Sequence, residues 1–280
     1  MERSSTSVRD LAVIRQLLNQ DPIWAAYALA DLQPAFAPHC RWYTGDDAVL
    51  LLFHALTPPI LLTVGAPTAI AALLMEADQT AAGLPKQVFI SALPEHLPLL
   101  QRYYDFTQPD GNTALQQMMR MAFRHAEALT AVSTTAAARL QPVDAPRIEQ
   151  LLQHGGPFTP DAFDAYQLDE GVFFGLNDET GKLLAVGGTH IVDWHEGVGA
   201  IGNMYTHPAQ RGKGYARLIL GAIVKTLQQG GIHNIVLNVN RKNSTAMLLY
   251  EQYGFVGHCP FVEGIGVKRQ RQGTVASDGV

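Results

Sequence analysis

The sequence predicts an α/β protein with two tandem domains, each built on a central mixed β-sheet flanked by helices. Apolar runs of strand length alternate along the chain with segments whose apolar residues repeat at helical spacing. The length of 280 residues exceeds the usual size of a single domain. We therefore expect one domain at 1–127, a linker at 128–138, a second domain at 139–268 and a flexible tail at 269–280.

The N-terminal half begins with two segments of helical character, residues 8–18 and 22–32. Strand-like runs follow, interrupted by helical segments, in the order strand, strand, strand, helix, strand, helix. These elements are expected at 41–44, 49–56, 60–64, 66–77, 87–92 and 95–104. This half therefore contains enough strands for a sheet of its own.

The C-terminal half has the predicted order β-α-α-β-β-β-α-β-α-β. Its strands are expected at 137–140, 171–176, 183–192, 197–205, 232–239 and 257–267. Its first three helices are expected at 145–153, 160–166 and 216–229. Asn243 or Ser244 suits the N-cap of a fourth helix, and Gly254 suits a left-handed residue at its C-terminal end.

A glycine-containing turn joins the strand that ends near Thr206 to the helix that starts near Ala216. Two glycines, Gly212 and Gly214, let the backbone curl so that several N–H groups point into one concavity. The helix N-terminus, Arg211 and Lys213 add positive charge, and a pyrophosphate is the expected ligand. Neither the Walker spacing nor the dinucleotide-binding fingerprint is present here.

The composition indicates a folded chain with no charge pattern for binding polyanions. Hydrophobic residues make up 47%, charged residues 16%, and the net charge is −5. We expect no nucleic-acid and no membrane partner, and interpret Lys268 to Arg271 as a solvated tail. The two cysteines lie in different halves and show neither disulfide nor zinc spacing, so no metal is expected. Without the apolar core of a signal peptide at the N-terminus, a cytoplasmic location is expected.

Two segments in the C-terminal half resemble the signatures of the GNAT superfamily of N-acyltransferases. The first is Arg-x-x-Gly-x-Ala, formed by Arg211, Gly214 and Ala216. The second is Asn-x-x-Ala-x-x-x-Tyr-x-x-x-Gly-Phe, formed by Asn243, Ala246, Tyr250, Gly254 and Phe255. The two occur in family order, and the stretch from Gly202 to Thr206 looks closest to glycine N-acyltransferase-like members.

The resemblance implies that acetyl-coenzyme A (acetyl-CoA) is the cosubstrate. Backbone groups of the preceding strand would pair with the pantetheine arm, and one N–H would stabilise the oxyanion. The turn would hold the pyrophosphate, and residues of the second signature would complete the site. The implied coenzyme-binding residues are Met204, Tyr205, Thr206, Arg211, Gly212, Lys213, Gly214, Tyr215, Ala216, Asn243 and Ala246.

The resemblance also implies acetyl transfer to a primary amine by direct attack in a ternary complex. Tyr250 would protonate the leaving thiolate, although a packed helix aromatic is the alternative interpretation. Many family members carry a glutamate base at the position that is Gly202 here, so no base is inherited. The candidate bases lie on the preceding hairpin: Glu196 and His190 first, with His195 and Asp193 beside them.

The implied acceptor is a small-molecule or amino-acid-like amine. Transfer of a longer acyl group and a non-catalytic coenzyme A sensor or interaction module stay open as alternatives, and the chain is expected to be a monomer or homodimer. The N-terminal half is interpreted as a degenerate GNAT-like domain, because no Arg-x-x-Gly-x-Ala turn precedes its helix at 66–77. Leu99 to Phe106 echoes Leu248 to Phe255, with Gln101 in the place of Tyr250.

Overall fold

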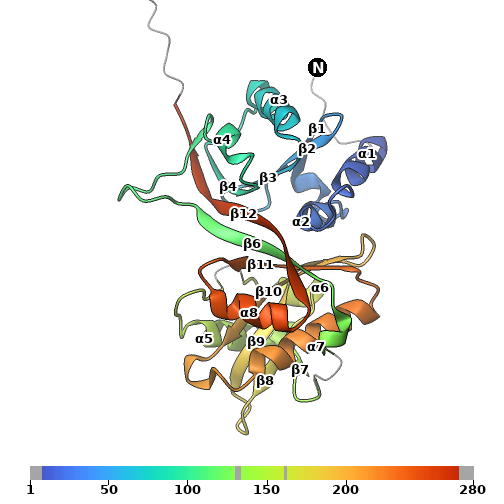
Figure 1. Ribbon diagram of the computed structural model, residues 1–280, viewed down its shortest axis with the longest axis vertical. Coiled ribbons are helices and arrows are strands. Elements are labelled where there is room, and N and C mark those ends of the chain that lie inside the picture. Colours follow the sequence, from blue (N-terminus) through green and yellow to red (C-terminus); the bar gives the residue numbers. More distant parts are fainter. Residues whose placement is uncertain (1–7, 130–133, 161–162, 271–280) are drawn as a thin grey trace, which may run out of the picture. The chain divides into compact units, whose positions relative to one another are not determined.

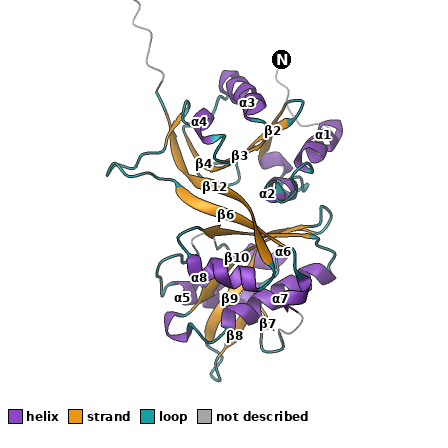
Figure 2. Ribbon diagram, in the orientation of Figure 1, coloured by secondary structure: helices purple, strands orange, loops and turns teal. Residues whose placement is uncertain are grey.

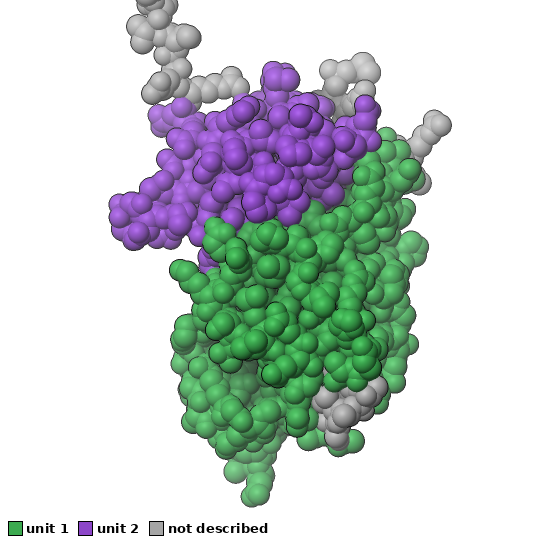
Figure 3. Space-filling view, viewed as in Figure 1, with its two compact units in different colours: residues 1–38, 117–261 green, residues 39–116, 262–280 purple. Residues whose placement is uncertain are grey.

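The computed structural model describes residues 8–129, 134–160 and 163–270 (Figure 1). The chain divides into two compact units, coloured separately in Figure 3. Unit 1 comprises Met1–Pro38 and Gln117–Phe261, and unit 2 comprises His39–Gln116 and Val262–Val280. Each unit is therefore assembled from two separate stretches of chain.

The sheet of unit 1 runs in the order β6-β11-β10-β9-β8-β7, with the first part of β12 beside β6. These strands are β6 (Gln116–Phe123), β7 (Ala138–Arg139), β8 (Phe174–Asn177), β9 (Leu183–Asp193), β10 (Val198–Thr206), β11 (Asn234–Asn240) and β12 (Phe255–Lys268). Strands β10 and β11 pair in parallel, whereas β6–β11, β9–β10, β8–β9 and β7–β8 are antiparallel. The parallel pair requires a crossover, which a helix supplies.

Helices flank this sheet (Figure 2), and strand side chains point alternately into two apolar clusters. The helices are α1 (Val8–Leu18), α2 (Ala26–Ala30), α5 (Ala145–Leu152), α6 (Gln167–Glu170), α7 (Tyr215–Gln229) and α8 (Ser244–Gln252). One cluster joins α7 and α8 to Ile201 and Leu237, and the other joins α5 to Val186 and Tyr205. From β7 to β12 the element order is the predicted one.

The strands of unit 2 run in the order β1-β2-β3-β4 followed by the second part of β12, which also pairs with β5. The strands are β1 (Cys40–Thr44), β2 (Ala48–Phe53), β3 (Ile60–Gly65), β4 (Gln87–Ala92) and β5 (Tyr104–Asp105), with helices α3 (Pro67–Gln79) and α4 (Leu97–Leu100). Strands β3 and β4 are parallel, and α3 crosses between them. Short 3-10 helices occupy Ala37–His39, Ala126–Leu129, Pro142–Asp144 and Pro208–Gln210.

The compact units differ from the expected division of the chain at residue 127. Helices α1 and α2 belong to unit 1, because α2 packs on β9 and β10. Strand β6 was not predicted, since its run of Met and Ala carries a charged residue, Arg120, at its centre. Arg120 is nevertheless buried at the centre of a regular strand.

Some of the expected segments include residues that the structure does not describe. The expected linker includes 130–133, and the expected tail includes 271–280, which lie outside them. The helix expected at 160–166 covers 161–162, also outside, and the described helix here is α6, which begins at Gln167. Within the described ranges, no helix is both long and apolar enough to cross a membrane.

Candidate active site

The parallel strands β10 and β11 separate part of the way along unit 1. Their register runs from Val198↔Asn234 to Ile201↔Leu237, and no further ladder pair joins them among the described residues. Strand β10 continues to Thr206 and stays paired with β9 on its other edge, across a bulge between Gly202 and Tyr205. The stretch from Gly202 to Thr206 therefore has backbone groups that an extended ligand with amides can pair with.

The loop of residues 207–214 leads from this open end of β10 to α7. Gly212 and Gly214 have φ of 80° and 78°, and Gly214 is the left-handed residue directly before the helix. A side chain at either position would impose left-handed strain, so glycine permits the predicted curl. The first-turn N–H groups of α7 lie beside this loop and suit an anion.

Two cations lie on the loop. Arg211 is exposed, its Nε donates to the carbonyl of Thr206 at 3.3 Å, and its guanidinium lies 5.9 Å from the Tyr205 ring centroid. Lys213 donates to the side-chain carbonyl of Gln210 at 2.7 Å. Among the described residues neither cation pairs with a carboxylate, so both charges are available to a phosphate.

The second predicted signature forms a short helix with fixed ends. The Asn243 side-chain oxygen accepts the N–H of Ala246 at 3.2 Å, which makes it the N-cap of α8. Gly254 has φ of 91°, and a Cβ there would lie 2.4 Å from the carbonyl oxygen of His125. Both capping predictions are confirmed. The Asn243 oxygen is used by the cap, which leaves its amide NH₂ for a ligand.

Tyr250 lies on α8 with its ring packed edge-on against Phe255, at 6.0 Å between centroids. It is 8% exposed and shares a cluster with Val239 and Met204, which flank the opening between β11 and β10. Burial raises the pKa of Tyr250 to about 12, so the phenol keeps its proton at neutral pH. No described residue hydrogen-bonds its hydroxyl, which is free to donate to a ligand.

His190, on β9, fills the space beside Gly202. A Cβ built at Gly202 would lie 2.1 Å from His190 Nε2, so the ring occupies the place that a side chain at 202 would need. The other ring nitrogen, Nδ1, lies 3.1 Å from the hydroxyl of Tyr27 on α2. The His190 imidazole therefore fills the space that a glutamate at position 202 would need.

The remaining base candidates lie in the turn between β9 and β10. The Glu196 carboxylate is bound by Arg15 Nε at 2.7 Å and by His195 Nδ1 at 3.2 Å. Asp193 accepts the backbone N–H groups of His195 and Glu196 at 2.8 and 3.0 Å. These carboxylates hold the turn and tie α1 to it, and only His190 stands beside Gly202.

Two further polar residues, Asn203 and Asp31, were not predicted as site residues. Asn203 is buried at the β10 bulge with φ of 53°, and its amide NH₂ donates to Gln167 at 2.9 Å. Its side-chain oxygen has no partner in the structure. Burial raises the pKa of Asp31, at the end of α2, to about 8. An acidic residue closing an otherwise apolar helix was the only signal in the sequence.

Arg120 anchors α2 to the sheet. Its guanidinium carbon lies 5.2 Å from the Trp24 ring centroid and 5.0 Å from that of Tyr27. Its NH1 donates to the carbonyls of Ile23 and Trp24, at 3.1 and 3.0 Å. In the sequence, the only indication of this role was a single arginine within an apolar run. The Arg120 guanidinium packs on the ring of Tyr27, whose hydroxyl contacts His190 Nδ1.

These features agree with comparisons to known proteins. The sequence matches the Acetyltransferase (GNAT) family over residues 145–255, a stretch that holds β10, the loop, α7 and α8. Together with both signatures and the predicted element order, this match shows that the chain carries a GNAT acetyltransferase domain. Among the described residues, no group of three metal-ligating side chains accompanies it.

Two curated relatives are mycothiol acetyltransferases. The one from Kocuria rhizophila is 37% identical over 92 residues, covering 28% of this chain and 30% of that protein. The one from an Arthrobacter species is 33% identical over 81 residues, covering 28% of this chain and 25% of that protein. The chain thus matches less than a third of the length of these relatives.

Solved structures extend the likeness in fold to most of the chain. A Drosophila protein covers 94% of this chain with 97% of its own, at a TM-score of 0.70 and 14% identity. A GNAT family acetyltransferase from Colwellia psychrerythraea covers 96% of this chain with 99% of its own, at a TM-score of 0.56 and 14% identity. At such low identity the likeness shows the fold alone.

Proposed function

We propose that the protein transfers an acetyl group from acetyl-CoA to a primary amine of a small-molecule or amino-acid-like acceptor. The observation that carries this proposal is the end of β10, which has no ladder pair with β11 among the described residues and leads directly into a cationic, glycine-containing loop at the start of α7. Its shape suits a ligand with an amide-bearing arm and a pyrophosphate. The curated relatives support a small-molecule acceptor, since both are named for mycothiol. A cytoplasmic location stays a prediction.

The coenzyme would bind along β10. Backbone groups of Met204, Tyr205 and Thr206 would pair with the pantetheine amides as an added strand. The N–H groups of residues 211–216 and the side chains of Arg211 and Lys213 would hold the pyrophosphate. Asn243 and Ala246, at the start of α8, would border the arm on the β11 side.

The acceptor amine would attack the thioester carbon directly in the ternary complex. His190 Nε2 would accept the proton that the amine loses, and its Nδ1–H would donate to the Tyr27 oxygen, which leaves Nε2 unprotonated. A backbone N–H of β10 would stabilise the oxyanion as the C–N bond forms. When the C–S bond breaks, the Tyr250 hydroxyl would protonate the thiolate.

His190 is a better base than Glu196 in this arrangement. The Glu196 carboxylate already has two hydrogen-bonded partners, and one is the cation of Arg15. Using it as a base would break an ion pair, whereas His190 Nε2 faces the space beside Gly202. The alternatives of a longer acyl group and a non-catalytic module are separated from this proposal by experiment.

The test is a screen of amines and amino acids for thiol release from acetyl-CoA, followed by two matched variants. His190→Gln should lower kcat roughly 10²-fold and remove the acidic limb of the pH–rate profile, because the base is lost. Glu196→Gln should keep that limb. The reverse pattern would assign the base to Glu196. Coenzyme binding without turnover on any amine, or with longer acyl groups only, would favour the alternatives.

A further inference from the structure

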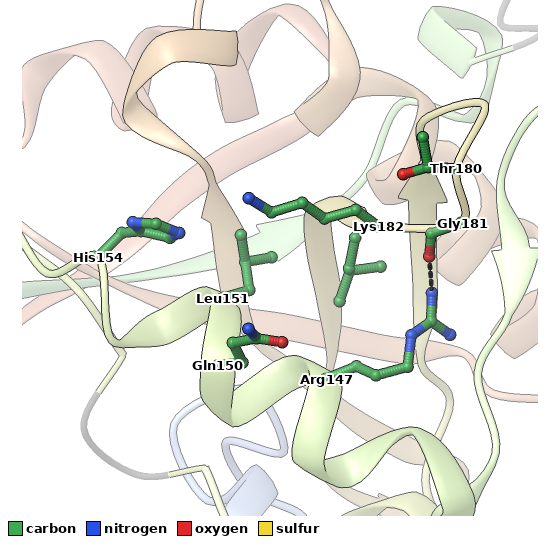
Figure 4. Close-up of a pocket in the computed structure, with 8 residues that line it drawn as sticks. Arg147, Gln150, Leu151, His154, Thr180, Gly181 and Lys182 are labelled. Atoms are coloured by element: carbon green, nitrogen blue, oxygen red, sulfur yellow. Dashed lines mark hydrogen bonds between the residues drawn. The ribbon is translucent and has the colours of Figure 1, made fainter.

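A pocket of about 280 Å³ opens between the end of α5 and the turn from β8 to β9 (Figure 4). It lies next to the loop of residues 207–214, because the N–H of His207 at the start of that loop donates to the Leu184 carbonyl on β9 at 2.9 Å. The His207 ring also stands edge-on to His154, with 4.2 Å between centroids. The pocket and the loop therefore share one boundary.

The walls of the pocket are held in place by packing and hydrogen bonds. Leu151 and Leu183, both 3% exposed, form its apolar side. Arg147 donates to the Gly181 carbonyl at 2.7 Å (Figure 4). It also donates to the Asn177 side chain at 2.6 Å and pairs with Asp144. The charge of Arg147 is thus already used, and its contacts fix the turn.

The other cations around the pocket have no such partners. Lys182 extends across the pocket toward His154 (Figure 4). In the described part of the chain no carboxylate lies within ion-pair distance of Lys182, His154, His207 or Arg211. Asp178, four residues before Lys182, accepts the Lys182 backbone N–H at 3.0 Å and the Thr180 hydroxyl at 2.7 Å. Lys182 and Arg211 are therefore two cations at this edge of the domain that form no ion pair among the described residues.

The electrostatics of His207 agree with this picture. Its pKa lies below the usual value, through desolvation first and then through the positive charges of His154, Lys182 and Arg211. Lys182, at the pocket, and Arg211, on the loop, thus both act on this ring. Such a cluster stabilises a ligand with high charge density, and a phosphate monoester carries close to two negative charges at neutral pH.

We propose that this pocket binds a phosphate monoester, held by Lys182 and His154 beside a coenzyme pyrophosphate on the loop. The inference rests on the proposed coenzyme binding. The shared boundary with the loop favours the 3′-phosphate of coenzyme A as the source, and a phosphate on the acceptor is the other source. The site would make acetyl-CoA a better ligand than its 3′-dephospho form.

The test compares coenzyme A with 3′-dephospho-coenzyme A by isothermal titration calorimetry, in the wild type and in Lys182→Gln. The 3′-phosphate should strengthen binding roughly tenfold in the wild type, because charge-assisted hydrogen bonds are the strong ones. Lys182→Gln should bind both forms with equal affinity. Lys225→Gln removes the same charge from α7 and should keep the preference, because α7 packs in the other apolar cluster.

A second arm uses inorganic phosphate, followed by NMR of the histidine rings. Equal binding of the two coenzyme forms, with phosphate still perturbing His154 and His207 in the wild type but not in Lys182→Gln, would assign the phosphate to the acceptor. Equal binding with no response to phosphate overturns the proposal. Loss of all coenzyme binding would overturn the proposed function instead. The titration with inorganic phosphate would then still test whether the pocket binds phosphate.

Discussion

Each unit contains a strand, a crossover helix and a second parallel strand, yet the two connections differ. In unit 1, eight residues, 207–214, separate β10 from α7 and include two left-handed glycines. In unit 2, only Ala66 separates β3 from α3, and Pro67 at the first helical position has no N–H to offer. The same topology therefore produces a glycine-containing loop before the helix in one unit and a direct strand-to-helix connection in the other.

The openings between the parallel strands also differ. In unit 2 the register ends at Leu62↔Ser91, although β3 continues to Gly65. The buried ring of His96 occupies this end of β3: Nε2–H donates to the Gly65 carbonyl at 3.0 Å, and Nδ1 lies 2.9 Å from the Thr63 hydroxyl. In unit 1 the corresponding backbone is available. The comparison supports the proposal that the N-terminal half is a degenerate copy without coenzyme.

The largest expected effect comes from closing the cradle of unit 1. Gly214→Val places a β-branched residue at φ of 78°, which strains the turn and blocks the approach of phosphate to the backbone. Coenzyme affinity measured by calorimetry should fall at least ~100-fold. Gly111→Val is the matched control, since Gly111 has φ of 83° and open space in unit 2. Unchanged affinity in Gly214→Val would show that the pyrophosphate binds elsewhere.

The second test counts coenzyme molecules per chain. If unit 2 lacks a cradle and its opening is filled by His96, titration should give one coenzyme per chain. Arg211→Glu should reduce the measured stoichiometry to zero at accessible concentrations, because the charge that faces the pyrophosphate is reversed. A stoichiometry of two would contradict the difference drawn between the two units.

The third test concerns Tyr250, whose place is taken by Gln101 in the echo found in unit 2. Tyr250→Phe keeps the ring packed against Phe255 but removes the donor, so kcat should fall roughly 10²-fold with little change in coenzyme affinity. Tyr250→Ala should also lower the thermal midpoint by leaving a cavity. Near-normal turnover in Tyr250→Phe would restrict this residue to packing.

The smallest expected effect is a pH dependence of stability from His96. Burial first of all lowers the pKa of His96, so the folded state holds it neutral. Neutral His96 therefore contributes fully to the free energy of unfolding above pH 6.5, the pKa of histidine in the unfolded chain. This contribution is lost as the pH falls toward the lower pKa of the folded state. Unfolding free energy should drop by on the order of 1 kcal/mol between pH 7.5 and 5.5. His96→Gln should flatten this dependence in denaturant titrations, and an equal slope in both proteins would remove His96 from it.

The sequence by itself determined the local elements and the coenzyme side of the candidate site. The turn with Gly212 and Gly214, the cap at Asn243 and the helix end at Gly254 follow from rules that act over a few residues. The helical spacing of Ala216, Ile219, Leu220, Ile223 and Leu227 predicts that these residues face the sheet; the last four are buried and Ala216 is half-buried. Such features need no knowledge of distant parts of the chain.

Only the tertiary structure decided the acceptor side and the grouping of the chain. His190 stands beside Gly202 because β9 and β10 are neighbours, and Tyr27 reaches it from α2, far away in sequence. Arg120 could not be recognised as a core residue, because its burial depends on the aromatic rings and carbonyls that surround its charge. Contacts between residues far apart in the sequence leave no local periodicity, and long-range packing alone sets them.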